Sequence, residues 1–472
     1  MKKIVIIGGG ISGLATAYEL LKLGDYDVTI VEKDDAAGGL ARSIEHNGFL
    51  TDLGPHRLNT ELPEVHELIE EIAGEKVIAL KRQSKMRLGR RYIEYPVKPF
   101  ELALTIGPFK PAWFMLSFML HQALHGRKEI DGTLEQYMMR AFGPSLYHYL
   151  FKPYVEKMWK MDATELSDQI GRVRLTVGGL DKLLKGLLSR DTSPEATGAL
   201  RESYYLRGGI NELAKHYLEK IEAAGGRIMT GAKVTGIEAS DAQLNSVQIK
   251  TGGAHQRLEC DILINTIPLP LFLPMLLRHR PSQAAADTMK RLRYLYLRLV
   301  CLIVERGHVS ANHWLYFPGA DLIFNRGHEA KNFDESMAPA GQSLICLEVT
   351  CHEGDELANM PREELIRRVR TDIVGTGLMR DDEIVDAFVQ DVPWAYPVYY
   401  KDYAADLSVI WDYLAGFPNL LSCGRQGLYN HNNIDHSIVM GLACARCIHQ
   451  NESPAQAWPE KFSAFDQFRI VD

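Results

Sequence analysis

The sequence of 472 residues predicts an α/β fold, because apolar runs and helical patterns alternate from its first residues. Residues 4–7 form an apolar run that ends in Gly8-x-Gly10-x-x-Gly13 and leads directly into a helical pattern. A second apolar run, residues 28–31, ends on Glu32. A strand, a glycine turn, a helix and a second strand in this order predict a Rossmann-type unit that binds a dinucleotide.

Each glycine of this first turn has its own physical role. Gly8 allows the tight turn, Gly10 lets the backbone approach a pyrophosphate, and Gly13 lets the helix pack closely on the strand. The N-terminus of the helix directs unpaired N–H groups at the same anion. Glu32 is placed to accept hydrogen bonds from a ribose diol. The residues expected to hold the nucleotide here are Gly8, Gly10, Ile11, Ser12, Gly13, Glu32 and Lys33.

A second glycine turn indicates which dinucleotide is bound. Gly38-Gly39 follows the acid after a short loop, and residues 52–56 read Asp-Leu-Gly-Pro-His. This order resembles the flavoproteins with two dinucleotide-binding motifs, so it favours non-covalent FAD over NAD. A second glycine turn would let the backbone pass close to the ribityl chain and the pyrophosphate, and residues 54–56 would lie near the isoalloxazine ring. The cofactor-binding residues expected in this part are Gly39, Leu40, Gly54, Pro55 and His56.

Composition narrows the class of protein. The chain has 53 Lys and Arg against 60 Asp and Glu, and no sustained basic stripe, which argues against a nucleic-acid partner. Its seven scattered cysteines are typical of reduced thiols in a cytoplasmic protein. The pair Cys444-x-x-Cys447 is expected to be packed inside a helix, and no metal site is expected.

Apolar runs in this sequence are too short to cross a membrane. The longest candidate is residues 112–126, which contain Trp, Phe, Met and Leu but also His and Gln. We expect a helix packed in the core, with peripheral membrane contact as the less favoured alternative.

The nucleotide-binding domain is predicted to be discontinuous. Gly208-Gly209 opens a second helical pattern, residues 260–266 read as a buried strand, and residues 419–423 read as another strand before a helix over 438–448. We therefore assign residues 1–75, 203–268 and 415–452 to a Rossmann-type FAD-binding domain, and residues 76–202 and 269–414 to a mixed α+β substrate domain. Residues 191–198 are expected to form an exposed loop.

Four later segments carry a more specific resemblance. Residues 154–159 read Tyr-Val-Glu-Lys-Met-Trp, residues 325–333 hold Arg326 and Glu329, residues 396–398 read Tyr-Pro-Val, and Gly424-Arg425 leads through Tyr429 to the last helix. With the Gly-Pro-His segment at 54–56, these resemble the UDP-galactopyranose mutase family, and more loosely the protoporphyrinogen-oxidase and amine-oxidase flavoproteins. The resemblance runs from the N-terminus to about residue 450.

The resemblance implies a reaction and roles for residues. In that family, N5 of the reduced flavin attacks the anomeric carbon of a nucleotide sugar, and two arginines clamp the departing diphosphate. By matching motif, the catalytic residues are His56, Arg326 and Arg425. The implied substrate-binding residues are Tyr154, Trp159, Arg174, Tyr396, Tyr429 and His431. Further implied cofactor-binding residues are Val234, Gly424, Asn433, Ile434 and Ser437, and NAD(P)H would be an external reductant.

Some alternatives stay open at this stage. His431 and Asn433 stand where the family usually has Tyr and Asp. The polar run 430–437 fits either N-capping of the last helix or hydrogen bonding to the flavin pyrimidine. Arg174 fits either a phosphate contact or a surface charge. An oxidase or desaturase with O₂ or a quinone as oxidant, whose apolar cleft residues 112–120 would line, is the main alternative function. A flavin-binding protein without turnover is a third alternative, and the oligomeric state is open.

Overall fold

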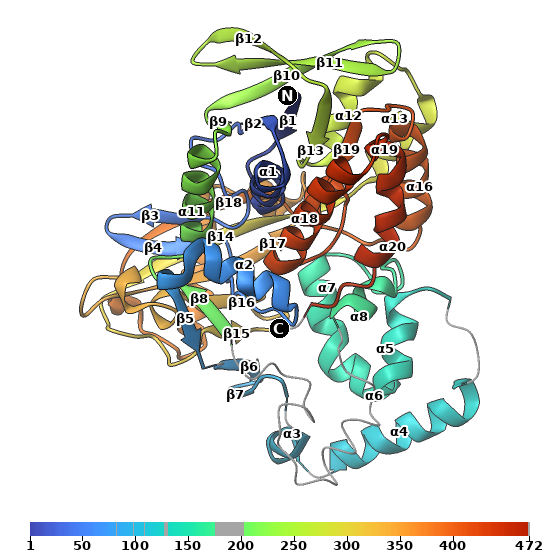
Figure 1. The fold of residues 1–472 in the computed structure, drawn as a ribbon. Coiled ribbons are helices and arrows are strands. Elements are labelled where there is room, and N and C mark those ends of the chain that lie inside the picture. Colours follow the sequence, from blue (N-terminus) through green and yellow to red (C-terminus); the bar gives the residue numbers. More distant parts are fainter. Residues whose placement is uncertain (82, 98, 108, 127–130, 175–202, 471–472) are drawn as a thin grey trace.

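The computed structural model describes residues 1–81, 83–97, 99–107, 109–126, 131–174 and 203–470. Figure 1 shows a parallel sheet with helices on both sides in the upper half, a large antiparallel sheet below it, and a group of helices at the lower right. The predicted loop at 191–198 lies outside the described residues.

A five-stranded parallel sheet has the order β19-β13-β1-β2-β9. Its strands are β1 (Lys2–Ile7), β2 (Tyr26–Val31), β9 (Arg227–Met229), β13 (Ile262–Asn265) and β19 (Leu420–Ser422). Helix α1 (Ile11–Leu23) packs between α11 (Asn211–Ala223) and α18 (Ile434–Gln450). The predicted α/β fold is confirmed, and strands far apart in the sequence lie side by side in one sheet because their apolar runs are buried on both faces.

A seven-stranded sheet has the order β18-β14-β17-β16-β15-β6-β7, and only the β15–β6 pair is parallel. Its strands are β6 (Ser84–Leu88), β7 (Arg91–Glu94), β14 (Tyr294–Val304), β15 (Trp314–Tyr316), β16 (Arg326–Glu329), β17 (Ser343–Cys351) and β18 (Ile384–Pro397). Helix α15 (Arg362–Gly375) packs on β14 and β18. Nearly every residue of β14 and β17 is buried, so this sheet forms the second core.

Smaller ladders and helices complete the chain. The ladders are β3 (Ser43–His46) with β4 (Phe49–Asp52), β5 (Val77–Leu80) with β8 (Ser203–Leu206), and β10 (Ala232–Ser240), β11 (Gln243–Thr251) and β12 (Ala254–Glu259). The other helices and turns are α2 (Pro63–Ala73), η1 (Gly74–Lys76), α3 (Pro99–Ile106), α4 (Phe109–His125), α5 (Leu134–Phe142), α6 (Pro144–Leu146), η2 (Tyr147–Phe151), α7 (Lys152–Trp159), α8 (Gln169–Arg174), α12 (Leu269–Leu277), α13 (Gln283–Arg291), η3 (Ala330–Asn332), η4 (Glu335–Met337), α14 (Glu356–Asn359), η5 (Asp381–Glu383), α16 (Tyr403–Leu414), α17 (Gly424–Gly427), α19 (Pro454–Ala457), η6 (Trp458–Lys461) and α20 (Phe462–Phe465).

Helix α4 differs from its predicted place in the core. Trp113 is 57% exposed and Leu124 is 68% exposed, and Phe114 is the residue of this helix that is buried. The reason is geometric: α4 lies at the lower edge of the molecule (Figure 1), where α5 and α6 cover only one of its faces. Among the described residues, no helix is long and apolar enough to cross a bilayer. The pair Cys444 and Cys447 is buried on α18, as predicted.

Candidate active site

Two glycine turns lie against each other beside the carboxyl ends of β1 and β2. The N–H of Gly38 donates to the carbonyl of Gly9 at 2.7 Å. A Cβ on Gly39, whose φ is +60°, would lie 3.0 Å from the Cα of Gly10. A Cβ on Gly13 would lie 2.4 Å from the carbonyl oxygen of Gly8. Side chains are therefore excluded at this point, and bare backbone is left to face a ligand.

The N-terminus of α1 fits the pyrophosphate of FAD. Gly10 is its N-cap, no side chain caps the helix, and its first turn holds no acid. The first N–H groups and the positive end of the helix dipole are therefore uncompensated, which is the arrangement that binds a phosphate. Gly424 lies directly on Ser12, because a Cβ at Gly424 would be 2.0 Å from the Ser12 hydroxyl oxygen. This cradle matches the chemistry of the group that the sequence predicted.

Glu32, the residue predicted to bind the ribose, is buried and directly follows β2. Its carboxylate accepts from the N–H of Gly9 at 2.8 Å and from the N–H of Asp34 at 2.9 Å, and each oxygen keeps a further lone pair. Val234 lies on β10, whose first residue donates its N–H to the Glu32 carbonyl at 2.8 Å. The Lys33 side chain is 61% exposed and pairs with Asp34 at 2.6 Å.

A pocket opens between these turns and the antiparallel sheet. It brings together ten residues that the sequence singled out: Leu40, Gly54, Pro55, His56, Arg174, Arg326, Tyr396, Arg425, His431 and Asn433. It is completed by residues that had no individual predicted role: Leu53, Leu297, Trp314, Val392, Ala395, Asn432 and Ile470. The pocket therefore combines an apolar wall with a concentration of cationic side chains.

Two arginines of the pocket have no carboxylate partner among the described residues. The Arg425 guanidinium donates to the Ala395 carbonyl at 3.3 Å and to the side chain of Asn432 at 3.3 Å. Arg174 and Arg425 lie over the ring of Tyr396, at 5.8 Å and 5.3 Å from its centroid. Burial, and then the nearby charge of Arg174, lower the pKa of Arg425. Both positive charges are thus available to an anion.

Arg326 has a different environment from the one expected. Its Nε and Nη2 both donate to the carboxylate of Glu348 at 2.8 Å, and the two side chains are 7% and 1% exposed. Its Nη2 also donates to the hydroxyl of Tyr396 at 3.3 Å. The expectation that the Arg326 fork clamps a diphosphate is therefore corrected: the fork is bound by an acid on the neighbouring strand β17, and the pair is neutral.

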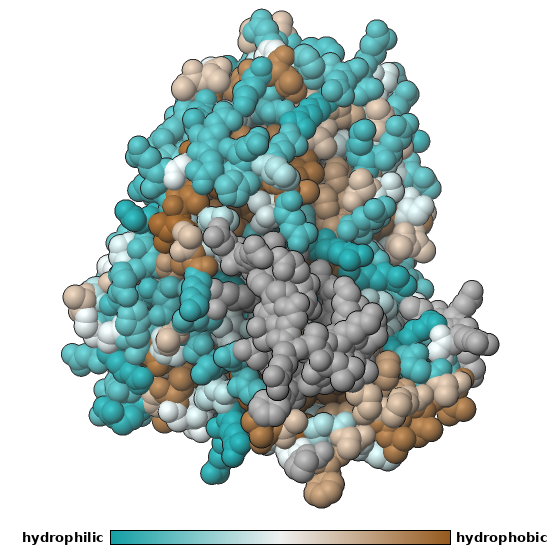
Figure 2. All heavy atoms as spheres, turned by 60° about the horizontal axis from the view of Figure 1, so that its bottom comes forward, coloured by the Kyte–Doolittle hydropathy of each residue, from teal (hydrophilic) through white to brown (hydrophobic). Residues whose placement is uncertain are grey.

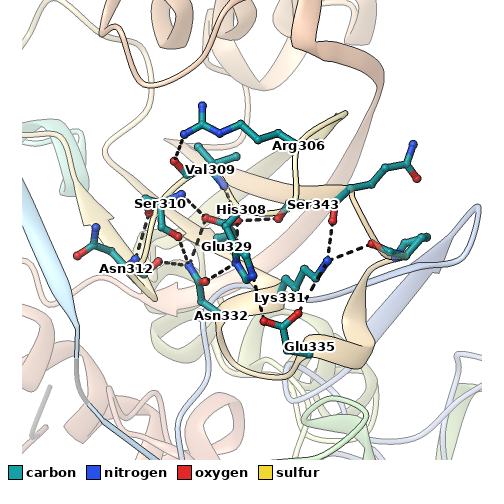
Figure 3. A network of polar contacts seen from close by, with 12 residues as sticks. Arg306, His308, Val309, Ser310, Asn312, Glu329, Lys331, Asn332, Glu335 and Ser343 are labelled. Carbon is teal, nitrogen blue, oxygen red and sulfur yellow. Dashed lines mark hydrogen bonds and ion pairs between the residues drawn. The ribbon is translucent and has the colours of Figure 1, made fainter.

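Glu329, the acid of the same motif, points away from Arg326, since residues three apart on a strand lie on opposite faces. It accepts from the N–H groups of Val309 and Ser310 at 2.7 Å and 2.8 Å and from the Ser343 hydroxyl at 2.7 Å. Figure 3 shows this separate network, in which Glu329 fixes the loop around residues 308–312. Its role is structural.

Two histidines of the pocket are neutral near pH 7. Burial, with Arg425 and Arg326 nearby, lowers the pKa of His56 to about 3. Burial and then the charge of Arg174 lower the pKa of His431 well below its usual value. The Nε2 of His431 accepts from the Nε of Arg174 at 3.0 Å, so its proton lies on Nδ1. That Nδ1 has no hydrogen-bond partner among the described residues, which leaves it free to donate.

Three of the six predicted substrate-binding side chains do not line the pocket. Tyr429 is fully buried, and the carbonyl oxygens of Arg293 and Val398 share its one hydroxyl proton at 2.6 Å and 2.8 Å, so its substrate-binding role is corrected to a structural one. Trp159 is 2% exposed and stands behind the pocket, with its ring 5.6 Å from that of His431. Tyr154 also stands behind, with its ring 6.1 Å from that of Tyr316. None of the residues 112–120 is among those that line it.

Part of the polar run 430–437 caps the N-terminus of α18, which is one of the two roles that the sequence left open for this run. Asn433 is the N-cap of α18, and its N–H donates to the Nδ1 of His436 at 3.2 Å. The Ser437 hydroxyl donates to the side chain of Asn432 at 3.2 Å, and Ile434 is buried in the first turn. Since Asn432 and Asn433 also line the pocket, this helix start faces the same space.

Sequence reasoning missed two buried acids that organise the site. Asp52 accepts from the hydroxyls of Ser43 at 2.6 Å and Tyr205 at 2.7 Å, and burial raises its pKa to about 6. Glu348 is the counterion of Arg326. A signal for Glu348 was present, because a carboxylate inside the apolar run 343–351 must find a buried partner. Asp52 precedes the Gly54 turn but gives no comparable signal.

The segment near residue 470 completes one wall. Ile470 is 3% exposed and its N–H donates to the carbonyl of Val173 at 2.8 Å, next to Arg174. The Gln169 side chain donates to the carbonyl of Asp466 at 2.9 Å, and the ring of Phe468 stacks on His436 with centroids 4.3 Å apart. No sequence motif pointed to this contact.

A Rossmann-type sheet with an uncapped helix start and a second glycine turn defines a protein of the dinucleotide-binding flavoprotein class. Residues 11–448 match the model of the family described as flavin containing amine oxidoreductase, and the chain belongs to that family. It is therefore a FAD-dependent enzyme.

Known proteins show how far this likeness extends. The chain is 23% identical over 469 residues to the mitochondrial protoporphyrinogen oxidase of Nicotiana tabacum, and this alignment covers 90% of each of the two chains. It is 26% identical over 245 residues to protoporphyrinogen oxidase 2 of Arabidopsis thaliana, a match that spans 45% of this chain and 46% of that one. The crystal structure of reduced UDP-galactopyranose mutase superposes with a TM-score of 0.80 at 20% identity, covering 98% of both chains. The predicted likeness to the mutase fold is confirmed.

Proposed function

We propose that this flavoenzyme acts on a nucleotide sugar or a related glycosyl substrate, in the manner of UDP-galactopyranose mutase. The observation that carries the proposal is the pair Arg174 and Arg425, which lack carboxylate partners among the described residues and lie over one tyrosine ring. Because Glu348 neutralises Arg326, the pocket arginines keep two positive charges, which match the two negative charges of an esterified diphosphate.

The cofactor would be held by the elements already described. The N-terminus of α1 and the two glycine turns would bind the pyrophosphate, Glu32 the ribose, and residues 54–56 with the start of α18 would lie beside the ring. When bound and reduced, the flavin would supply a nucleophilic N5 toward an anomeric carbon. An external reductant such as NAD(P)H would then be needed, and a cytoplasmic location fits that need.

The residues of this chain would position the substrate and stabilise its leaving group. Arg174 and Arg425 would donate to the diphosphate oxygens and offset the negative charge that develops on them as their bond to the sugar carbon breaks. Tyr396 would add a hydroxyl donor between them, and neutral His431 would donate from its free Nδ1. Trp159, packed against Arg174 and His431, would hold both in place and act as a positioning residue.

A second candidate is an oxidase or desaturase of the protoporphyrinogen-oxidase type. The observation that favours it is the alignment with the tobacco enzyme across 90% of each chain. The same arginines would then bind substrate carboxylates, and O₂ or a quinone would reoxidise the flavin. The pocket is less suited to a substrate without charges, because Arg174 and Arg425 line it without carboxylate partners among the described residues. A flavoprotein without turnover would leave the uncompensated arginines unexplained.

An anaerobic assay separates these functions. The purified holoenzyme, with its flavin oxidised or reduced by dithionite, would be given UDP-galactose and a panel of other sugar nucleotides, and the products separated by chromatography. We expect a ring-isomerised product with reduced flavin alone. Flavin bleaching by a substrate that recovers in air, with no isomerised product, would instead support the oxidase. If no substrate gives either an isomerised product or flavin bleaching, the result would support a flavoprotein without turnover.

A further inference from the structure

The outer face of α4 is an apolar surface that no described part of the chain covers. Its exposed side chains are Phe109, Ala112, Trp113, Leu116, Met119, Leu120, Ala123 and Leu124. They follow helical spacing along the full length of the helix, and the helix contains no carboxylate. Figure 2 shows hydrophobic residues gathered at the lower right of the molecule, on the side where Figure 1 has α4. A contiguous apolar patch of this kind marks a binding surface.

The opposite face of α4 fixes the helix to the molecule, so the exposed face has a set direction. The Phe114 ring packs 5.5 Å from that of Tyr149. The hydroxyl of Ser145 donates to that of Ser117 at 2.9 Å, and the Gln122 side chain donates to the carbonyl of Arg140 at 2.7 Å. The helix therefore cannot turn its outer side chains inward without breaking these contacts.

The chain around this face has a charge opposite to that of the whole protein. The described residues between 84 and 125 include five Lys and Arg against two Asp and Glu, whereas the full chain has 53 against 60. Lys110, Arg90 and Arg91 are exposed. The ammonium of Lys110 lies 4.7 Å from the ring centroid of Tyr149, which lines a hollow together with Arg90 in the β6–β7 turn. Cations thus border the first turn of the apolar face.

We propose that this face of α4, with the β6–β7 turn, docks on the surface of an anionic lipid bilayer. Apolar side chains with a bordering tryptophan enter the boundary between headgroups and acyl chains, and neighbouring cations meet lipid phosphates. At 17 residues the helix is about 25 Å long and lies on the bilayer rather than across it. A two-fold pair of copies would bring the same excess of cations against itself, which is unfavourable.

Vesicle sedimentation of the intact holoenzyme tests the proposal. We expect binding to phosphatidylcholine vesicles that contain phosphatidylglycerol, weaker binding to phosphatidylcholine alone, and a loss of affinity as salt is added. The double variant Leu116→Ser/Leu120→Ser should bind about tenfold more weakly for each leucine. Arg90→Glu/Arg91→Glu should lose the preference for the anionic vesicles. The matched control is Leu271→Ser, which changes a leucine on α12 that is 42% exposed and remote in sequence.

These substitutions change exposed side chains, so the variants should fold, and an unchanged visible flavin spectrum would check this. If the unmodified protein binds both kinds of vesicle equally, or binds neither, the proposal is overturned. So would light scattering that shows a dimer which Leu116→Ser/Leu120→Ser converts to a monomer, because a second copy would then cover the face.

Discussion

At the scale of single residues, the three arginines of the pocket differ in what surrounds their charge. Arg326 is neutralised by Glu348 in a buried bidentate pair, whereas Arg425 has only backbone and amide acceptors. The same substitution should therefore affect different properties at the two positions. At Arg326 it should lower the stability of the fold, and at Arg425 it should weaken ligand binding.

Arg425→Ala should weaken binding of UDP by about 1.5–3 kcal/mol, the scale of hydrogen bonds to a charged group, while the flavin is retained. Arg326→Ala should instead destabilise the fold by about 3–5 kcal/mol, because Glu348 stays buried without its counterion. Isothermal titration with UDP measures the first effect, and urea unfolding measures the second. Arg367→Ala changes a side chain that is 74% exposed and serves as the control for both. Unchanged UDP affinity in Arg425→Ala would remove Arg425 from the binding site.

Asp52 makes stability depend on pH. Burial raises its pKa from 3.8 to about 6, so the folded state holds a proton that the unfolded state releases between these values. The contribution of this group to the free energy of unfolding should fall as the pH rises from about 4 to 6, by about 3 kcal/mol. Asp52→Asn should remove that fall, since an amide stays neutral. Urea unfolding at a series of pH values compares it with Asp25→Asn, an exposed acid; identical pH profiles for the two variants would contradict the assignment.

At the scale of elements, the contact between the two glycine turns limits what either turn can accept. A Cβ at Gly10 would lie 3.9 Å from the Cα of Gly39, which is an ordinary contact, so it is the two further methyl groups of a valine that would fill the space between the turns that a pyrophosphate would need. Gly10→Val should abolish stoichiometric flavin binding, measured by the ratio of visible to ultraviolet absorbance of the purified protein. Gly307→Val is the control, because a Cβ at Gly307 meets open space. A yellow Gly10→Val protein with full flavin content would overturn the nucleotide assignment.

Elements with strong local patterns were predictable from the sequence. Local apolar runs or helical spacing predict the secondary structure of several elements. These elements are the parallel strands, the first helix, α18, β14 and β17. The place of α4 was not predictable, because its apolar spacing is the same whether a neighbour covers it or not. The pairing of Arg326 with Glu348 depends on the register between β16 and β17, and no simple sequence pattern encodes this register for two residues that are 22 positions apart.

The site shows the same division. Residues that belong to motifs, such as Gly54, Pro55 and His56, line the pocket. Tyr429 and Glu329 also belong to motifs but serve the fold, because hydrogen bonding to buried backbone fixes them away from the pocket. Ile470 and Trp314 reach the pocket through tertiary contacts alone. Motifs therefore located the site, and packing decided which side chains face it.

At the scale of the whole molecule, one sheet depends on strands from distant parts of the chain. β1 pairs with β2 and β13, and β13 pairs with β19. A chain that ends at residue 414 would lack β19 and α18, which is a main packing partner of α1. We expect this truncated chain to bind no FAD, as measured by flavin fluorescence after gel filtration. Flavin retained by the truncated chain would show that the first two segments alone build the binding site.

The distance along the chain between β1 and β19 also has a consequence for biosynthesis. A ribosome releases β1 first, and the residue that completes the sheet follows more than four hundred positions later. At about 5–20 residues per second, the nascent chain carries an incomplete sheet edge for roughly 20–80 s. If the truncated chain binds no FAD, as we expect, then FAD can be captured only after β19 has been synthesised. Until then an unpaired, buried-type strand is exposed to other nascent chains, and chaperones that cover strand edges should act on this protein in that interval.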